Sequence, residues 1–459
     1  MHRSPLLLTV GLVVAAVLNA QAATAQPSDD YSTIPRVKSR VIIETDAPGG
    51  DPDDEASLTR FFLYMNEWDV EGMVATRPKR ISRSVPGKKR IMQFIDDYET
   101  VLPNLRTHAD GWPSPDHLRD VTVKSYGGKK GTEEAPLEST SARDHVIDVI
   151  DKDDPRPVWY LNWGAFTGGE RTALDQAMDY VKKHRSAKEY KAFADKVHYV
   201  QLHRYEMLGK EHLSVLPLYM DVSYPEMDGG WWYHRWEPIT TAVEGFDLEE
   251  DLQTDHGPLV GNYTIPKEGD TPTFMHLIPT GLHVPYRPGW GSWSGRFGFD
   301  EERSMWLPDQ RDAWQGTTNR DNTLARWAKH IQHDFMARAD WAVAESYDQA
   351  NHAPDPHLQG DGSRDVLYIK TGLGESLRLS AEGTTDPDEG DELSYQWTYY
   401  PEPGSYDGEV TIENAQSPQA TVHVPSDSEE QTIHVVLQVT DDGEPSLTRY
   451  RRAVIMGDD

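Results

Sequence analysis

The feature that most constrains this chain is a group of acids placed between a short apolar run and a helical pattern. Residues 41–43 form the apolar run, and residues 44–54 add five carboxylic acids and a Pro-Gly-Gly turn. From Ala56 to Met65, apolar side chains recur at helical spacing. The stretch therefore predicts a buried strand, a loop and a helix. Its acids would lie at the carboxyl end of the strand, where open α/β sheets bind their ligands.

The acids of this loop are close enough in sequence to disturb one another. Packed carboxylates raise one another's pKa unless a positive charge neutralises them. Ca²⁺ prefers clustered carboxylate and carbonyl oxygens, which makes it the expected neutralising ion. The alternative is a solvated acidic loop in which Asp53 caps the following helix. The placement after a strand and before a helix favours the metal site.

The same stretch resembles the aspartate signature of nucleoside hydrolases, in which a strand is followed by Asp-x-Asp, Pro-Gly, Asp-Asp and a helix. The residues that fit this signature are Asp46, Pro48, Gly49, Asp53 and Asp54. Two features differ, because Glu44 replaces the first aspartate and the loop is a few residues longer. This longer form is similar to the nucleoside hydrolase-like domain of a cellulose-binding protein family.

The resemblance implies an α/β domain of nucleoside hydrolase-like (Rossmann-like) fold, with a mostly parallel sheet and helices on both faces. The patterns along the chain agree with alternating strands and helices. Strands are expected over 69–76, 157–162 and 196–202, and helices over 141–151, 172–181 and 322–343.

The 459 residues are enough for two domains. We expect a signal peptide over 1–25, a nucleoside hydrolase-like domain over 36–345, a linker over 346–356 and an all-β Ig-like sandwich over 357–459. The sandwich is predicted from short alternating strands, and its turns resemble those of PKD- or cadherin-like repeats. Its aspartates either form ordinary turns or could hold a structural Ca²⁺. They are Asp386, Asp388, Asp391, Asp441 and Asp442.

The charge and the N-terminus restrict the partners. A net charge of −31 argues against binding nucleic acid or anionic membranes, and the absence of cysteine excludes thiolate chemistry. An apolar stretch from Leu6 to Leu18, followed by small residues, predicts a secreted or periplasmic protein. No later segment is apolar enough for membrane insertion. The oligomeric state is left open.

The resemblance assigns roles to single residues. Asp46, Asp54 and Asp270 would hold Ca²⁺, Asp46 would also act as the catalytic base, and Asp53 would bind a sugar hydroxyl. Thr172 is the candidate fourth metal ligand, with Thr167 as the alternate and helix capping as the other interpretation of Thr172. Nucleoside hydrolases of the inosine-uridine type have a leaving-group histidine before the late aspartate. Here that position is Gly269.

Three further residues are candidates for substrate binding. Glu268 belongs to the Lys-Glu-Gly-Asp segment that the resembled family carries before the late aspartate. Trp293 and Arg296 lie in a Gly-Trp loop that would form the rim of a sugar site, because a rigid aromatic face is easily desolvated. A structural loop is the alternative for this segment.

The leading hypothesis is a Ca²⁺-dependent hydrolase acting on an N- or O-glycosidic bond of a polysaccharide or small glycoside, with a ribosyl- or furanosyl-like sugar. The alternative is a non-catalytic protein that binds cellulose or another polysaccharide. A cell-surface adhesion module is a third hypothesis, which only the sandwich favours. Sugar release with and without a chelator, beside cellulose pull-down, separates the three.

Overall fold

The computed structural model describes residues 38–48, 53–76, 87–125, 140–163, 172–201, 218–219, 242–266, 268–302 and 304–458. The predicted signal peptide, Asp51 and Thr167 lie outside these ranges. Among the helices of the described residues, none combines the length and the apolar character that a bilayer span requires.

The first part of the chain is built on a sheet whose strand order is β3-β2-β1-β4-β5-β6-β8-β7. All neighbouring pairs are parallel except β7 and β8, which form an antiparallel edge. The strands are β1 (Ser39–Thr45), β2 (Trp68–Thr76), β3 (Thr122–Ser125), β4 (Val158–Trp163), β5 (Val197–Gln201), β6 (Leu218–Tyr219), β7 (Gly298–Asp300) and β8 (Met305–Leu307). The predicted mostly parallel sheet is confirmed.

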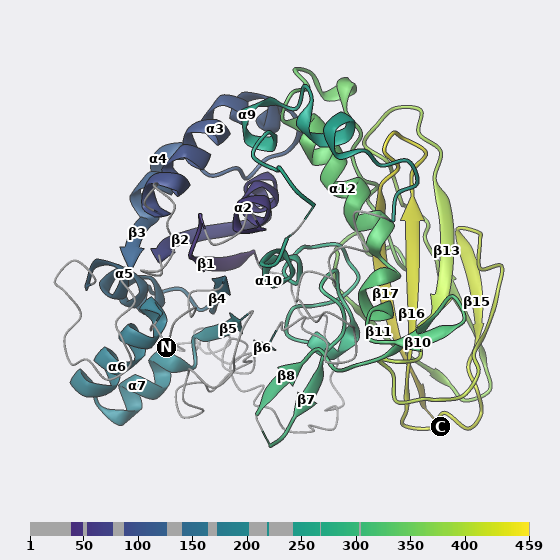
Figure 1. Cartoon of the computed structure of the whole chain (residues 1–459). Coiled ribbons are helices and arrows are strands. Elements are labelled where there is room, and N and C mark those ends of the chain that lie inside the picture. The colour runs from purple at the N-terminus through teal and green to yellow at the C-terminus, as the bar shows by residue number, and fades with distance from the viewer. Residues whose placement is uncertain are drawn as a thin grey trace, which may run out of the picture.

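Helices cover both faces of this sheet (Figure 1). Because successive strand residues point to opposite faces, Val41 and Ile43 enter one core with α2 (Asp53–Leu63), α3 (Gly87–His108) and α12 (Ala328–Trp341). Ile42 enters the other core with α5 (Thr140–Asp151), α6 (Ala173–His184) and α7 (Ala187–Ala194). Burial on both faces explains why β1 has a continuous apolar run.

Several short elements complete this part. They are the helices α4 (Pro115–Val121), α9 (Gly257–Val260), α10 (Thr271–Met275) and α11 (Asn322–Ala325), the strands β9 (Asp312–Trp314) and β10 (Thr317–Asn319), and the 3-10 helix η1 (Met65–Glu67). The helix predicted over 322–343 is therefore two helices, α11 and α12. They separate at Trp327, whose amide donates to the carbonyl of Leu324 in a tighter turn at 2.9 Å.

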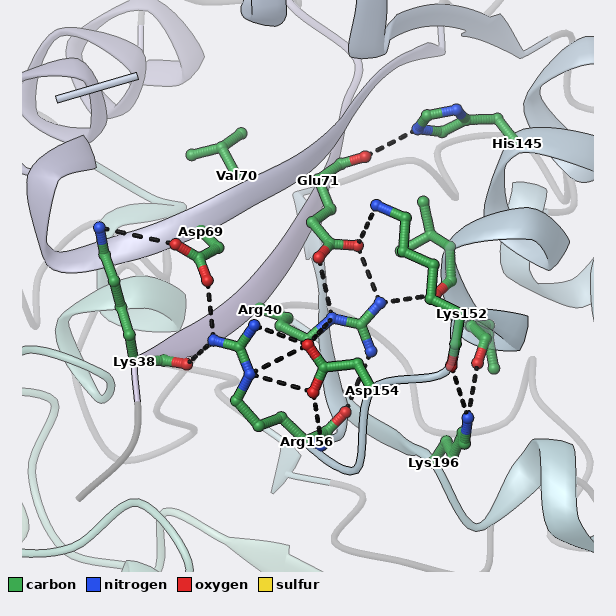
Figure 2. A network of polar contacts seen from close by, with 12 residues as sticks. Lys38, Arg40, Asp69, Val70, Glu71, His145, Lys152, Asp154, Arg156 and Lys196 are labelled. Atoms are coloured by element: carbon green, nitrogen blue, oxygen red, sulfur yellow. Dashed lines mark hydrogen bonds and ion pairs between the residues drawn. The ribbon is translucent and has the colours of Figure 1, made fainter. Parts of the chain in front are cut away.

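Charged side chains link β1 and β2 to the carboxyl end of α5 (Figure 2). The fully buried Arg40 of β1 donates to both carboxylate oxygens of Glu71 in β2, each at 2.9 Å, and to the Val149 carbonyl at 2.7 Å. Lys152 also donates to Glu71 at 3.0 Å. Because a buried guanidinium needs a fixed anionic partner, this network holds the strands in place at one end.

The end of the chain forms two further sheets, which confirm the predicted β-sandwich. One has the order β11-β17-β16-β13 and the other β12-β15-β14. All their pairs are antiparallel except β11 with β17. The strands are β11 (Leu367–Gly372), β12 (Ser376–Ser380), β13 (Ser394–Tyr399), β14 (Thr411–Glu413), β15 (Gln419–His423), β16 (Thr432–Thr440) and β17 (Thr448–Asp458).

The sandwich shares a buried contact surface with the α/β part, and α12 lies between them (Figure 1). Tyr450 of β17 belongs to the same apolar cluster as Trp293 and Trp327. Arg449 reaches Asp334 of α12 at 2.6 Å. The domain boundaries at 345 and 357 stay a prediction, and the linker predicted between them is packed into this contact surface.

Candidate active site

The acidic loop lies at the point where the order of the parallel strands changes direction. From β1 the chain moves to β2 and β3 on one side, and it later returns to β4 and β5 on the other. Such a switch point leaves a crevice at the carboxyl ends of the two central strands, where α/β proteins bind ligands. Asp46 follows directly after β1 at this edge.

Local hydrogen bonds connect the end of β1 with the start of α2. The Thr45 hydroxyl accepts from the Ala47 amide and donates to Asp54 Oδ1, each at 3.0 Å. Asp53 and Asp54 occupy the first turn of α2, where the helix dipole favours negative charge. The side chain of Thr45 therefore fixes the position of Asp54 relative to the end of β1.

A buried ion pair made by Glu268, just before Asp270 in the sequence, helps to hold Asp270 at this edge of the sheet. Glu268 accepts from Arg60 of α2 at 2.6 and 2.7 Å, and also from the hydroxyls of Tyr263 and Thr271. The backbone amide of Asp270 donates to Ser57 of α2 at 3.2 Å. These contacts hold the segment against the helix that begins with Asp53 and Asp54.

The four acids act on one another electrostatically. Burial and the charges of Asp54, Asp53 and Asp46 raise the pKa of Asp270 well above its usual range, and a hydrogen bond with Asp54 adds to this effect. All four side chains are at least 93% buried, since their exposed fractions are 7, 2, 5 and 2% along the chain. The structure therefore brings Asp46, Asp53, Asp54 and Asp270 into one acidic site.

The chemistry of these donors is that of the ligands of a hard divalent cation. Buried carboxylates that repel one another must take up protons or be neutralised by an opposite charge. Carboxylate oxygens are the ligands that Ca²⁺ and Mg²⁺ use. Asp46, Asp54 and Asp270 are the residues that would hold the ion. The predicted convergence of their oxygens on a single ion stays a prediction.

Glu44 has a role that the sequence did not reveal. Its carboxylate is fully buried and accepts from Thr76 at 2.5 Å, from the Ala173 amide at 2.9 Å and, in a short contact, from Tyr160. Burial raises its pKa to about 7 although these hydrogen bonds lower it. Glu44 thus ties β1 to β2, β4 and the start of α6. The sequence held one indication of this role, namely a carboxylic acid directly after the apolar run of a strand predicted to be buried.

The structure gives Thr172 a capping role. It is the N-cap of α6, and its hydroxyl accepts from the Asp175 amide at 2.9 Å and donates to the Asp175 carboxylate at 3.0 Å. The Ala173 amide beside it donates to Glu44. These contacts correspond to the helix-cap interpretation, which was the alternative to metal ligation.

Three of the four residues predicted to bind substrate are buried, namely Glu268, Trp293 and Arg296. Glu268 is fully buried in its ion pair, and Trp293 is 1% exposed with its Nε1 donating to the Tyr450 hydroxyl at 3.3 Å. Arg296 pairs with Asp312 at 2.8 Å. Each of these polar groups is engaged within the protein, so their contacts are structural. The predicted sugar-binding role required exposed faces that these side chains do not have.

His276 follows Gly269 closely in sequence but is engaged elsewhere. Its Nε2 lies 2.9 Å from the Pro285 carbonyl and its Nδ1 3.2 Å from the Ser292 hydroxyl. The side chain is fully buried, and burial lowers its pKa to about 4. This histidine is neutral at neutral pH.

Acid is expected to destabilise the protein through His276. Between pH 6.5 and 4 the unfolded histidine takes up a proton that the folded one excludes. Stability present above pH 6.5 is therefore lost as the pH falls, by up to about 3 kcal/mol from this residue. His276→Gln removes the titration, so urea unfolding should show a smaller loss between pH 7 and 4.5 than in the wild type. Parallel pH profiles of the two proteins would contradict the prediction.

The fold and the acidic site together define a nucleoside hydrolase-like protein. Residues 40–297 match the family model described as cellulose-binding Sde182, nucleoside hydrolase-like domain. Residues 376–457 match that of the cellulose-binding protein Sde0182, C-terminal domain. The chain therefore belongs to the cellulose-binding Sde182 family.

Comparison with solved structures also indicates a nucleoside hydrolase-like fold. A nucleoside hydrolase-related hypothetical protein from Saccharophagus degradans, described as associated with carbohydrate metabolism, is 31% identical with a TM-score of 0.75. The match covers 92% of this chain and 100% of that one. The PKD domain of the KIAA 1837 protein is 21% identical over 20% of this chain and 82% of its own, but its TM-score of 0.16 carries no weight. No curated protein gives a significant match.

Proposed function

We propose that the chain is a Ca²⁺-dependent hydrolase of a glycosyl bond, of the N- or O-glycosidic type, with a ribosyl- or furanosyl-like sugar. The observation that carries this proposal is the meeting of Asp270 with Asp46, Asp53 and Asp54 beside the end of β1. Membership of a nucleoside hydrolase-like family supports it. A merely structural turn would not need four buried carboxylates from segments so far apart in the chain.

The acids divide the chemical work. Asp46, Asp54 and Asp270 would hold Ca²⁺, and the bound ion would supply positive charge that lowers the pKa of a nearby water and attracts vicinal sugar hydroxyls. Asp46 accepts the proton of the water that attacks the anomeric carbon. Asp53 accepts a hydrogen bond from a sugar hydroxyl. The surrounding carboxylates favour the positive charge that develops on the sugar ring as the glycosyl bond breaks.

The leaving group is the point at which the chain departs from nucleoside hydrolases. Gly269 has no side chain that could protonate a leaving base. We therefore expect the fastest hydrolysis with leaving groups that need little protonation, such as nitrophenol. A p-nitrophenyl furanoside is accordingly a better first substrate than a purine nucleoside.

The second candidate is a non-catalytic protein that binds cellulose or another polysaccharide. Gly269 favours it because glycine cannot protonate a leaving group, and the family description favours it because it reads cellulose-binding. An acidic site that binds Ca²⁺ for structural reasons would serve such a protein equally well.

One paired experiment distinguishes the two candidates. Release of nitrophenol and of free sugar is measured with Ca²⁺, with a chelator, and after Ca²⁺ is restored, while pull-down on insoluble cellulose is measured under the same conditions. Hydrolysis that is lost with the chelator and restored by Ca²⁺ supports the enzyme. Retention on cellulose without hydrolysis of nucleosides or furanosides supports the binding protein. Calorimetric titration with Ca²⁺ provides a readout that does not depend on activity.

We further propose that the protein acts in the periplasm or outside the cell. The support is the apolar N-terminal stretch with its small-residue cleavage site within residues 1–25. Mass spectrometry of the mature protein tests this. A chain that keeps its first 25 residues would contradict the proposal.

A further inference from the structure

A second group of aspartates lies at one end of the sandwich. One carboxylate oxygen from each of Asp386, Asp388 and Asp391 lies within 4.8 Å of the others. These residues precede β13, and Asp441 follows β16 directly. Because Ser394 of β13 pairs with Thr440 of β16, the register brings Asp441 to the same end of the sheet.

Three oxygens of this group are buried without a hydrogen-bond partner in the protein. They are the Oδ2 atoms of Asp386, Asp391 and Asp441. Asp441 is only 4% exposed, and its other oxygen already accepts from Asn351 Nδ2 at 3.0 Å and from the Leu447 amide at 2.8 Å. A buried carboxylate oxygen left unpaired is costly. Three such oxygens in one place indicate that an external group satisfies them.

The electrostatics of the group support this conclusion. Burial and the charges of Asp441, Asp388 and Asp391 raise the pKa of Asp386 to about 6, against a hydrogen bond from the Asp388 amide. The charge of Asp391 acts in turn on Asp441. Asp441 therefore belongs to the same group although it comes from another turn. None of these contacts and charges involves the acidic site beside β1.

We propose that Asp386, Asp388 and Asp391, with Asp441 beside them, bind one divalent cation with the oxygen preference of Ca²⁺, and that this cation fastens the sandwich to the α/β part. Carboxylates from two adjacent turns give the clustered oxygen ligands that Ca²⁺ favours. The inference is independent of the proposed catalytic function.

The contacts of Asp388 explain how the proposed cation would hold the sandwich against the α/β part. Its carboxylate accepts from the His352 amide at 2.6 Å and lies 2.9 Å from His352 Nδ1. The His352 ring stacks on Tyr347 at 3.7 Å and lies 5.1 Å from the ring of Trp341, the last residue of α12. Asn351 extends the connection, because its amide donates to Asp441. A cation that fixes Asp388 therefore also fixes the segment that joins α12 to the sandwich.

The test uses the full chain and Ca²⁺ alone as the probe. Asp386→Asn and Asp391→Asn, combined in one variant, remove charge but preserve shape. The number of Ca²⁺ ions bound per chain, measured calorimetrically, should fall by one relative to the wild type, whatever the site beside β1 binds. The Kd of the lost site is expected on the order of 10⁻⁴ M, as in other extracellular calcium modules. The rise in Tm that Ca²⁺ gives should shrink in the same variant.

The behaviour in chelator separates a cation site from an ordinary turn. In chelator, the variant should be at least as stable as the wild type, because its two asparagines no longer repel the neighbouring carboxylates. An ordinary Asp turn predicts the reverse, a variant that is less stable with and without Ca²⁺. Asp407→Asn, which changes an exposed aspartate away from the group, is the matched control and should leave both readouts unchanged. Equal Ca²⁺ stoichiometry and equal Ca²⁺-dependent Tm in wild type and variant would overturn the proposal.

Discussion

Asp46→Asn is expected to lower hydrolysis of a furanoside by about 10²–10⁴-fold, the usual effect of losing a positioned base, while the protein stays folded. Asparagine keeps the volume of the side chain and much of its hydrogen bonding, but it cannot accept the proton of the attacking water. Asp46 lies at the carboxyl end of β1 and is 7% exposed, so substitution by a side chain of the same shape leaves the packing intact. The rate must be measured at saturating Ca²⁺, because the variant is also expected to bind the ion less tightly.

Asp51→Asn is the matched control for this experiment. Asp51 lies in the additional part of the loop and has no counterpart in the nucleoside hydrolase signature. It should therefore retain activity close to that of the wild type. Greater damage from Asp51→Asn than from Asp46→Asn would show that the two loops have been aligned incorrectly. If neither variant alters hydrolysis, or if glycan binding occurs without any hydrolysis, the binding-protein candidate replaces the enzyme.

Glu268→Gln is expected to destabilise the protein by about 3–5 kcal/mol, because it leaves the buried guanidinium of Arg60 without its charged partner. Both side chains of this pair are fully buried, and the guanidinium also lies 3.7 Å from the ring centre of Phe335. Urea unfolding measures the loss. The Ca²⁺ affinity should fall as well, because Glu268 holds the segment that carries Asp270 against α2.

Two comparisons sharpen the test of Glu268. Replacing both partners, as Arg60→Met with Glu268→Leu, should cost less than Glu268→Gln alone, since no buried charge is left unpaired. The exposed pair of Arg185 and Asp151 serves as the control, and Arg185→Met should cost less than about 1 kcal/mol. A Glu268→Gln protein of normal stability that binds sugar less tightly would instead restore the substrate-binding role.

The sequence was most informative where local pattern and chemistry agree. The order strand, acidic loop and helix around Asp46 could be predicted because apolar spacing fixes both elements and the acids lie between them. The strand predicted over 69–76 is observed as Trp68–Thr76, and that predicted over 157–162 as Val158–Trp163. The second of these strands is recognisable because burial on both faces leaves a continuous run of apolar side chains.

Contacts between distant segments could not be predicted in this way. Trp293 in a glycine-rich loop gives the same local signal whether its ring faces water or packs against another part of the protein. Its actual partner, Tyr450, lies 157 residues further along the chain. Glu268 was similarly ambiguous, because nothing near it in sequence indicates that Arg60 of α2 will face it. Single-sequence patterns carry no information on such pairs.

The position of β17 has a consequence for the order of folding. This strand lies far from the α/β part in the sequence, yet Arg449 pairs with Asp334 of α12 and Tyr450 packs with Trp327 inside the core of the α/β part. During synthesis the N-terminal segments appear first. The contacts of Trp327 and Asp334 with this strand are therefore expected to form only after residues 448–458 have been made. A nascent chain in which β17 has not yet formed is expected to leave the ring of Trp327 uncovered by Tyr450, and so to be more open to aggregation and proteolysis than the folded protein.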